Sequence, residues 1–409
     1  MLDDLDKVLT AGRPHAGPRS ESRGMTPARP QPPRGQALSF RKKLAFSVVV
    51  TSAFALVLYA GSLGVRSLRI YRLVKDSQSG LRGRVLAPDP MLGFAPIPGS
   101  TGLELVPRGP GIPVRFDADG FRVPVDPPAD PQDGSPLVLT LGCSYTYGYL
   151  CRAEDAYPQV LSQLTGCRVK NAGMSCYGLA QMLLLARSLI PRYRPDYVVV
   201  QFSPWLVERA QSFYAHGPGF ITTPVPYLSE TPAGVVEVHP PVFGSKTQTV
   251  SLDAYRDGPA SLGDFLPFFF KAGGPLLLHD DFHITVHRLK RITGLTPPPA
   301  ADPRKIVDSV YREINDICKL NESKMLILVL GSDSQAVDTQ GVDRIAGVTI
   351  VDAHAAMLKR LPERTPEAYR RMYGHWRGDP PVYVDYHPNE AAQKVIAGEL
   401  ARFVVPSHL

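Results

Sequence analysis

The chain has 409 residues, 44% of them hydrophobic, which is enough for one large folded domain or two ordinary ones and excludes a chain that is disordered throughout. Lysine and arginine exceed aspartate and glutamate by 45 to 38, and this modest excess of +7 is spread along the chain, so nucleic acid is not indicated as a partner. Only five cysteines occur, with no CxxC pair, which argues against a zinc finger or a disulfide scaffold.

The amino-terminal region carries a candidate membrane anchor. Residues 1–43 are rich in Pro, Gly and Ser and are predicted to be a disordered tail. Residues 44–65 contain no charge, and their length suffices to cross a hydrocarbon core of roughly 30 Å. We interpret them as one uncleaved transmembrane helix, because a signal peptide has its apolar region nearer the start. A buried core helix is the alternative, but it would ordinarily show a polar stripe.

Positive charges flank this span on both sides, so the charge distribution favours one orientation only weakly. The first 43 residues carry nine Lys/Arg against four Asp/Glu, which favours a cytoplasmic amino terminus. The large carboxy-terminal part is then expected in the periplasm or outside the cell. Residues 66–133 are predicted to form a juxtamembrane helix or stalk, at about residues 70–84, and a small, turn-rich β lead-in from residue 89 onward.

The texture changes at about residue 134, where short apolar runs begin to alternate with helical patterns. Continuously apolar runs are typical of strands covered on both faces, hence of a parallel sheet. We predict an α/β domain over 134–409 with a doubly wound, parallel five-stranded sheet flanked by helices. Its strands are expected at 137–142, 167–173, 195–202, 324–331 and 347–353, with helices at 178–190 and 303–320. Residues 210–300, rich in Pro and aromatics and without a clear period, are predicted to be an insertion.

Two motifs in this domain indicate chemistry. Ser144 follows the first predicted strand directly, and ligands bind at the carboxyl ends of strands in open α/β sheets. A helix cap is the ordinary explanation of such a serine. Near the other end, His387 lies just before an amphipathic helix with Asp385 two residues away, and a carboxylate can hold the tautomer with which histidine removes a serine proton. A surface histidine beside a helix cap explains the same letters.

Together these motifs resemble the SGNH (GDSL-type) hydrolase superfamily, in a membrane-anchored bacterial branch, over about residues 137–405 without the insertion. Gly142-Cys143-Ser144 is similar to the first block, with Cys143 in place of the usual Asp. Asn171-Ala172-Gly173 is similar to the second block, whose glycine amide serves the oxyanion hole. Asp385 and His387 are similar to the last block, with one residue between them where two are usual.

The resemblance implies a flavodoxin-like fold and a set of roles. Ser144 is the expected nucleophile, His387 the base and Asp385 the acid, while the amides of Ser144 and Gly173 face the oxyanion; no metal and no cofactor are implied. The third block is missing, because Ser203-Pro204-Trp205-Leu206 stands where Gly-x-Asn-Asp is expected. Asn171, Gln201 and Trp205 are expected to line the site, and Gln201 or a residue of the insertion is a candidate for the absent donor.

The function implied is a membrane-anchored serine esterase acting on acyl or acetyl esters of cell-envelope carbohydrate or lipid. An O-acyltransferase of the same fold is a close alternative. A non-catalytic envelope scaffold or carbohydrate-binding protein is a third, and the missing asparagine supports it. The oligomeric state is not readable from the sequence.

Three further features have ordinary explanations. His279, His283 and His287 invite a metal interpretation, but a polar helix start explains them equally, and we predict no metal site. The apolar run 262–278 is a candidate for capping an acyl pocket or touching the bilayer; core packing is favoured, because Pro and Gly are expected to break any long amphipathic helix there. Cys151, Cys167 and Cys176 are candidates for disulfide pairing if the domain is exported.

Overall fold

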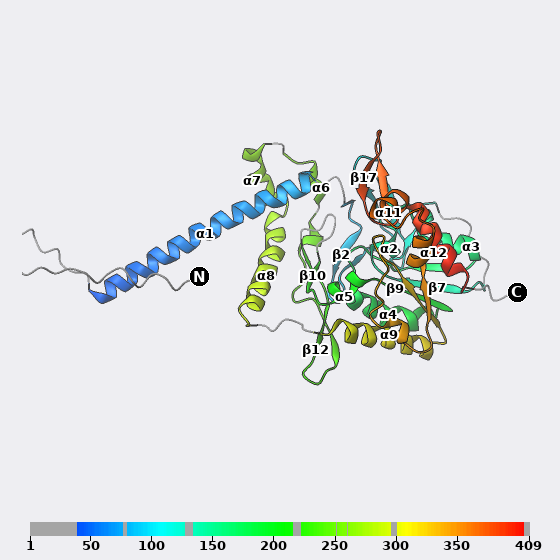
Figure 1. Ribbon diagram of the computed structural model, residues 1–409. Coiled ribbons are helices and arrows are strands. Elements are labelled where there is room, and N and C mark those ends of the chain that lie inside the picture. Colours follow the sequence, from blue (N-terminus) through cyan, green and yellow to red (C-terminus); the bar gives the residue numbers. More distant parts are fainter. Residues whose placement is uncertain are drawn as a thin grey trace, which may run out of the picture. The chain divides into compact units, whose positions relative to one another are not determined.

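The computed structural model describes residues 39–76, 80–126, 134–215, 222–250, 252–259, 261–295 and 301–404. Residues 1–38 of the predicted disordered tail therefore lie outside the described residues. The chain divides into two compact units, Met1–Tyr59 and Ala60–Leu409. The first unit contributes the beginning of a long helix, and the second contains the rest of that helix and all other elements (Figure 1).

The long helix α1 spans Phe40–Asp76 and is longer than the predicted span at both ends. Over Phe40–Arg72 it is long and apolar enough to cross a membrane, judged by length and composition alone. Of the juxtamembrane helix or stalk predicted at about residues 70–84, residues 70–76 are helical and continue α1 without a break. Its last turns are buried within the second unit, where Ile70 and Val74 pack against Tyr255, Phe265 and Phe269.

Six short strands follow α1, where the β lead-in is expected. Four of them form an antiparallel sheet in the order β1-β4-β5-β6, and the other two form a hairpin. This region shares a core with the following domain, since Phe94, Val114 and Phe116 pack with Tyr147 and Tyr177. The strands are β1 (Gly80–Arg82), β2 (Leu86–Asp89), β3 (Gly93–Pro96), β4 (Thr101–Leu105), β5 (Ile112–Phe116) and β6 (Arg122–Val123).

The central sheet contains the five predicted strands and is parallel throughout, in the order β15-β14-β9-β7-β8. The prediction of this sheet is confirmed. Strands β7 and β9 are buried along their whole length, which is why their sequences are continuously apolar. The strands are β7 (Leu137–Leu141), β8 (Arg168–Asn171), β9 (Tyr197–Phe202), β14 (Lys324–Val329) and β15 (Thr349–Asp352).

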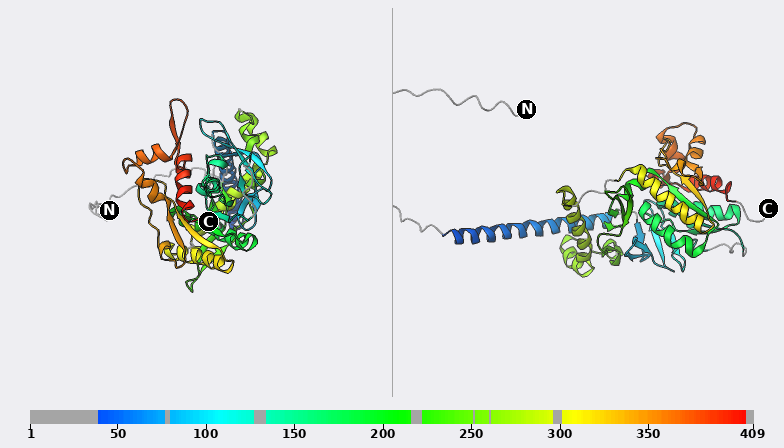
Figure 2. Two further views of the ribbon diagram at one scale, coloured as in Figure 1. Left: turned by 90° about the vertical axis from the view of Figure 1, so that its right-hand side faces the viewer. Right: turned by 90° about the horizontal axis from the view of Figure 1, so that it is seen from below.

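Helices cover both faces of this sheet (Figures 1 and 2). One group consists of α12 with α3 and α10, both of which contact it, and the other of α4, α5 and α9. The bounds are α2 (Ser144–Tyr147), α3 (Tyr157–Thr165), α4 (Leu179–Tyr193), α5 (Pro204–Ala210), α9 (Pro303–Leu320), α10 (Ala353–Lys359), α11 (Pro366–Tyr373) and α12 (Glu390–Ala401), with short 3-10 helices at Ala153–Asp155, Thr247–Thr249 and Val342–Arg344. A hairpin of β16 (His375–Arg377) and β17 (Val382–Asp385) precedes α12.

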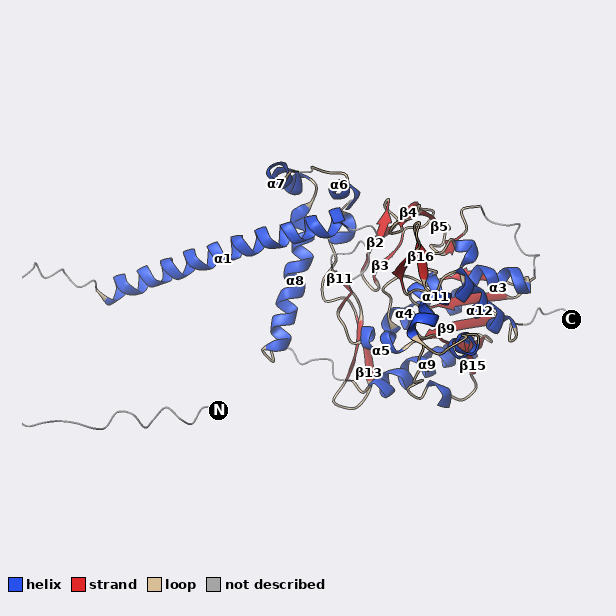
Figure 3. Ribbon diagram, turned by 45° about the horizontal axis from the view of Figure 1, so that its top comes forward, coloured by secondary structure: helices blue, strands red, loops and turns tan. Residues whose placement is uncertain are grey.

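The insertion contains two small hairpins and three helices (Figure 3). The expectation that Pro and Gly break any long helix in the run 262–278 is confirmed, because α7 ends at Lys271 and α8, of 19 residues, begins at Gly274. Pro275 stands in the first turn of α8, where its missing N–H removes no helical hydrogen bond, and Gly273 caps the start with φ 83°. The elements are β10 (Tyr214–Ala215), β11 (Thr223–Pro224), β12 (Tyr227–Glu230), β13 (Val236–His239), α6 (Leu252–Arg256), α7 (Leu262–Lys271) and α8 (Gly274–Ile292).

Candidate active site

Ser144 and His387 meet at the carboxyl edge of the central sheet, although 243 positions separate them in the chain. Ser144 is the first residue of α2 and follows the end of β7 closely. His387 lies in the loop between β17 and α12. The Nε2 atom of His387 is 2.9 Å from Ser144 Oγ, within hydrogen-bond distance.

Asp385 completes a chain of hydrogen bonds behind His387. Its Oδ1 lies 2.5 Å from His387 Nδ1 and also accepts the backbone N–H of His387 at 2.7 Å. Because Nδ1 faces a carboxylate, it carries the ring hydrogen, and Nε2 is left as the acceptor for the Ser144 hydroxyl. Burial acts to raise the pKa of the Asp385 carboxyl, but the hydrogen bonds from His387 outweigh it, and the pKa lies below its ordinary value. Asp385 is therefore ionised at neutral pH.

Three tyrosine rings surround the His387 ring. The ring centroids of Tyr145, Tyr149 and Tyr386 lie 5.3, 4.7 and 4.9 Å from it, and Tyr386 is stacked nearly parallel to it. Tyr145 is buried, whereas Tyr386 is half exposed. The imidazole is thus held by packing as well as by Asp385, and the access of water to it is restricted.

The amide of Gly173, an expected oxyanion donor, is engaged elsewhere. It donates to Asn171 Oδ1 at 3.0 Å, while Asn171 Nδ2 donates to the carbonyl oxygen of Thr146 at 3.1 Å. A Cβ at position 173 would lie 2.5 Å from Tyr147 N, so only glycine allows this approach to α2. Asn171 therefore ties the loop to α2, and an oxyanion role for Gly173 requires its amide to leave Asn171; that role stays a prediction. The Ser144 N–H, the first of α2, has no acceptor within the helix.

Gln201 supports the turn that carries Ser144. Its Oε1 accepts from the Cys143 N–H at 3.1 Å and from Thr146 Oγ1 at 2.9 Å. Its Nε2 donates to Ser203 Oγ at 2.9 Å and contacts Cys143 Sγ at 3.2 Å. The side chain is fully buried, and both ends of its amide are engaged. The expectation that Gln201 replaces the missing donor is therefore not met in this conformation.

Trp205 reaches the site through another ring. It lies in the first turn of α5, is partly buried and packs on Tyr145 with 5.0 Å between centroids. Tyr145 in turn contacts His387. Trp205 thus lies one side chain away from His387, and within the described part of the chain no hydrogen bond joins it to Ser144 or His387.

Two buried charged residues of the lead-in clamp the segment after α2, and sequence reasoning missed both. The Arg122 guanidinium on β6 donates to the carbonyl oxygens of Tyr147, Gly148 and Cys151, the last two at 2.7 Å. Glu104 on β4 accepts the Leu150 N–H at 2.7 Å. Burial raises the pKa of Glu104, although the charge of Arg122 opposes this. The clamped segment includes Tyr149, so the lead-in positions a ring that touches His387.

His375 is a third residue that the sequence did not indicate. It pairs with Asp385 across the β16–β17 ladder and is almost completely buried. Burial lowers its pKa to about 4, although the carboxylates of Glu390 and Asp385 act in the opposite direction. It is therefore a neutral histidine next to Asp385. Its Nε2 has no hydrogen-bond partner among the residues that the structure describes.

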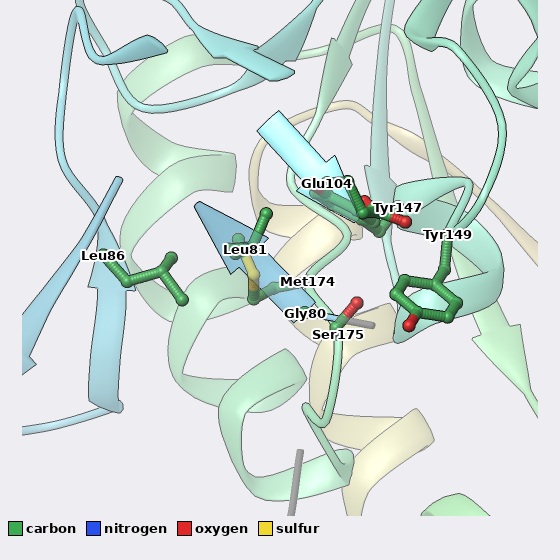
Figure 4. Close-up of a pocket in the computed structure, with 8 residues that line it drawn as sticks. All are labelled: Gly80, Leu81, Leu86, Glu104, Tyr147, Tyr149, Met174 and Ser175. Carbon is green, nitrogen blue, oxygen red and sulfur yellow. The ribbon is translucent and has the colours of Figure 1, made fainter. Parts of the chain in front are cut away.

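A narrow, mostly apolar pocket lies between the lead-in and the main domain (Figure 4). Tyr149 is a wall that it shares with the site, since the same ring contacts His387. Ser175 Oγ is buried without a hydrogen-bond partner among the described residues. The pocket is lined by Gly80, Leu81, Leu86, Glu104, Tyr147, Tyr149, Met174 and Ser175.

The three histidines of α8 and the cysteines all lie in packed surroundings. His279, His283 and His287 pack around Phe243, with ring centroids 6.0, 5.0 and 6.4 Å from it. No group of three or more metal-ligating side chains occurs in the described ranges. All five cysteines are free and buried, so the suggested pairing of Cys151, Cys167 and Cys176 is not formed.

Comparison with known proteins gives weak likenesses only. No protein-family model and no curated protein matches the chain. A G-D-S-L family lipolytic protein from Desulfitobacterium hafniense is 10% identical, covering 65% of this chain and 98% of its own, with a TM-score of 0.29. An acetylxylan esterase mutant from Geobacillus stearothermophilus is 14% identical, covering 66% and 94%, with a TM-score of 0.34. The α/β hydrolase LAE5 from the Lake Arreo metagenome is 12% identical, covering 66% and 95%, with a TM-score of 0.35. These values are too low to assign an activity, a substrate or a family.

Proposed function

We propose that the chain is a serine esterase of the SGNH type that acts on acyl or acetyl esters of cell-envelope carbohydrate or lipid. One observation carries the proposal: Ser144 Oγ lies 2.9 Å from His387 Nε2, while His387 Nδ1 faces Asp385 at 2.5 Å. A nucleophile, a base within hydrogen-bond reach and a group that orients the base are the parts that acyl transfer through serine needs.

In the proposed reaction, His387 Nε2 takes the Ser144 proton while Oγ attacks the ester carbonyl carbon. The resulting oxyanion faces the Ser144 N–H, and Asp385 stabilises the imidazolium. His387 then gives the proton to the leaving alcohol oxygen, the carbon–oxygen bond breaks and acyl-Ser144 remains. Water, deprotonated by His387, attacks this ester, and the carboxylic acid leaves as Ser144 recovers its proton.

The same residues support acyl transfer if a hydroxyl of an acceptor replaces water in the second half. The scaffold alternative rests on the missing third-block asparagine, and the hydrogen-bond distance between Ser144 and His387 weighs against it.

Labelling with a fluorophosphonate serine probe tests the proposal in the full chain. We expect the wild type to be labelled and Ser144→Ala to be unlabelled, because the probe reports an activated serine. Ser188→Ala, which removes an exposed hydroxyl on α4, is the matched control and should label like the wild type. A folded wild type that does not label, or equal labelling of Ser144→Ala, would contradict the proposal.

Asp385→Asn tests the role of the acid. An amide at this position allows the wrong tautomer of His387, so kcat for an aryl acetate should fall on the order of 10³–10⁴-fold with the thermal midpoint little changed. Glu367→Gln, a neutralising change of a 72% exposed side chain on α11, is the control and should retain the rate. Comparable rates in the two variants would remove Asp385 from the mechanism.

A further inference from the structure

One face of helix α8 packs against the rest of the second unit. Leu277, Asp280 and Ile284 are buried there. Asp280 Oδ2 accepts from the hydroxyl of Ser245 at 2.7 Å and from the Thr247 N–H at 2.9 Å, which fixes the helix against the preceding segment. Among the described residues, the opposite face of α8 stays exposed.

The same helix meets α1 at the residue where the uncharged stretch 44–65 ends. Arg66 is the first charge after that stretch, and its Nη1 lies 2.9 Å from Asp281 Oδ2 on α8. Its Nη2 donates to Thr285 Oγ1 at 3.3 Å. One turn further along α1, Ile70 packs with Phe265 of α7. Helices α7 and α8 are thus attached to α1 at the level at which a membrane span would leave the hydrocarbon.

Large apolar side chains are exposed on both helices. Phe282 and Leu289 lie seven residues apart on the side of α8 opposite its buried face, and Ile292, in the last turn, is 81% exposed. On α7, Leu266 and Phe270 are exposed, the latter by 63%, whereas Phe265 and Phe269 point into the core. In the described part of the chain, these five exposed residues are 42–81% exposed. Lys271 and Lys290 are exposed beside them.

We propose that α7 and α8 form a membrane platform whose exposed apolar side chains insert into the headgroup region of the bilayer that α1 crosses. The inference rests on the membrane span predicted from the sequence. Three observations favour a lipid surface over another occupant: the platform is continuous with the apolar helix, it is attached at the end of the uncharged stretch, and it combines apolar side chains with lysines, as interfacial helices do. The platform would hold Ser144 and His387 at a constant height above the membrane.

Nitroxide labels on single introduced cysteines test this in the full chain, reconstituted into phosphatidylcholine vesicles. The measurement is collisional accessibility to oxygen and to a water-soluble nickel chelate. Leu289→Cys and Ile292→Cys report on the platform. Leu320→Cys, at an 83% exposed leucine of α9, is the matched control in water, and Val50→Cys in α1 reports on the span. The native cysteines are buried, so the introduced ones are labelled selectively.

We expect the platform labels to lie about 5–10 Å below the lipid phosphates and the Leu320→Cys label to be fully accessible to nickel. If the platform labels are as accessible as the Leu320→Cys label while the Val50→Cys label is in hydrocarbon, the platform is overturned and the span stands. If the Val50→Cys label is also in water, the span is overturned and the platform with it. Esterase activity is measured separately through Ser144 labelling, so neither result depends on the proposed reaction.

Discussion

His375 lies directly behind the proposed relay, where it is opposite Asp385 in the β16–β17 ladder. Its pKa is lowered by burial to about 4, while Glu390 and Asp385 act to raise it. A neutral imidazole at this position leaves the negative charge of Asp385 directed at His387, to which both its hydrogen bonds go. Because a charged histidine would be buried here, protonation of His375 is coupled to folding.

The free energy of unfolding should therefore decrease as the pH falls between the unfolded and folded pKa values of His375. The folded pKa of about 4 lies below the unfolded value of about 6.5, so the contribution is complete above pH 6.5 and is lost as the pH falls toward 4. The loss is on the order of 3 kcal/mol in the free energy of unfolding. We expect His375→Gln to flatten this dependence, measured by denaturant unfolding at several pH values. Parallel pH curves for the two proteins would exclude His375 as the source.

At the scale of elements, the lead-in strands are part of the site's support. Strands β4 and β6 supply Glu104 and Arg122, which bind the backbone from Tyr147 to Cys151. That backbone is the continuation of α2, whose first residue is Ser144. The lead-in thus contributes to the position of the proposed nucleophile as well as to the chain's path away from α1.

Arg122→Met should be strongly destabilising, because it leaves Glu104 buried without its positive partner and three carbonyl oxygens without a donor. Leaving a buried acceptor without its hydrogen-bond donor costs about 1–3 kcal/mol. The measurement is denaturant unfolding together with the rate of Ser144 labelling in the folded fraction. Arg115→Met on β5 is the control, since that guanidinium makes an exposed hydrogen bond to Val125 O, and it should behave like the wild type. Equal stabilities of the two variants would show that the clamp contributes little.

Helix α5 carries Trp205 where the resemblance leads us to expect an asparagine as the third oxyanion donor. Trp205→Asn and Trp205→Ala both remove the packing on Tyr145. Only the first introduces an amide, and an oxyanion donor is worth about 2.7–4 kcal/mol when well placed. We expect the Asn variant to hydrolyse aryl esters faster per folded molecule than the Ala variant. Equal rates would show that an asparagine side chain at position 205 does not act as an oxyanion donor.

At the scale of the whole molecule, the described chain consists of a unit that carries the apolar start of α1 and a unit that carries the candidate site. If α1 spans the membrane, the two ends of the chain lie on opposite sides of it. The side on which the site lies decides which esters it meets, so the topology bears directly on the substrate.

We predict a cytoplasmic tag at Met1 and an extracytoplasmic tag at Leu409, from the excess of Lys/Arg over Asp/Glu before the span. Protease treatment of intact cells or spheroplasts should remove the carboxy-terminal tag and spare the amino-terminal one. Lysed cells, in which both tags are digested, are the control. The opposite pattern of protection would reverse the assignment.

The central sheet could be predicted from the sequence by itself, and so could Ser144 and His387 as candidate site residues. Strands buried on both faces must be apolar at successive positions, so β7, β9 and β14 were visible as runs. Ser144 and His387 were visible because each stands beside a strand or a helix start, where local sequence specifies the backbone. Their distance of 2.9 Å comes from the tertiary structure, because β17, the strand before His387, is not part of the central sheet.

Only the tertiary structure decided which residues support that pair. Arg122, Glu104 and His375 come from strands of two to five residues, too short for a periodic pattern, and their partners are distant in the chain. The engagement of the Gly173 amide by Asn171 and of Gln201 by the Ser144 turn depends on side-chain orientation, which spacing does not encode. The exposure of one face of α8 could not be predicted from the sequence for a related reason. An apolar residue looks the same in sequence whether it fills a core or faces outward, and only packing separates the two.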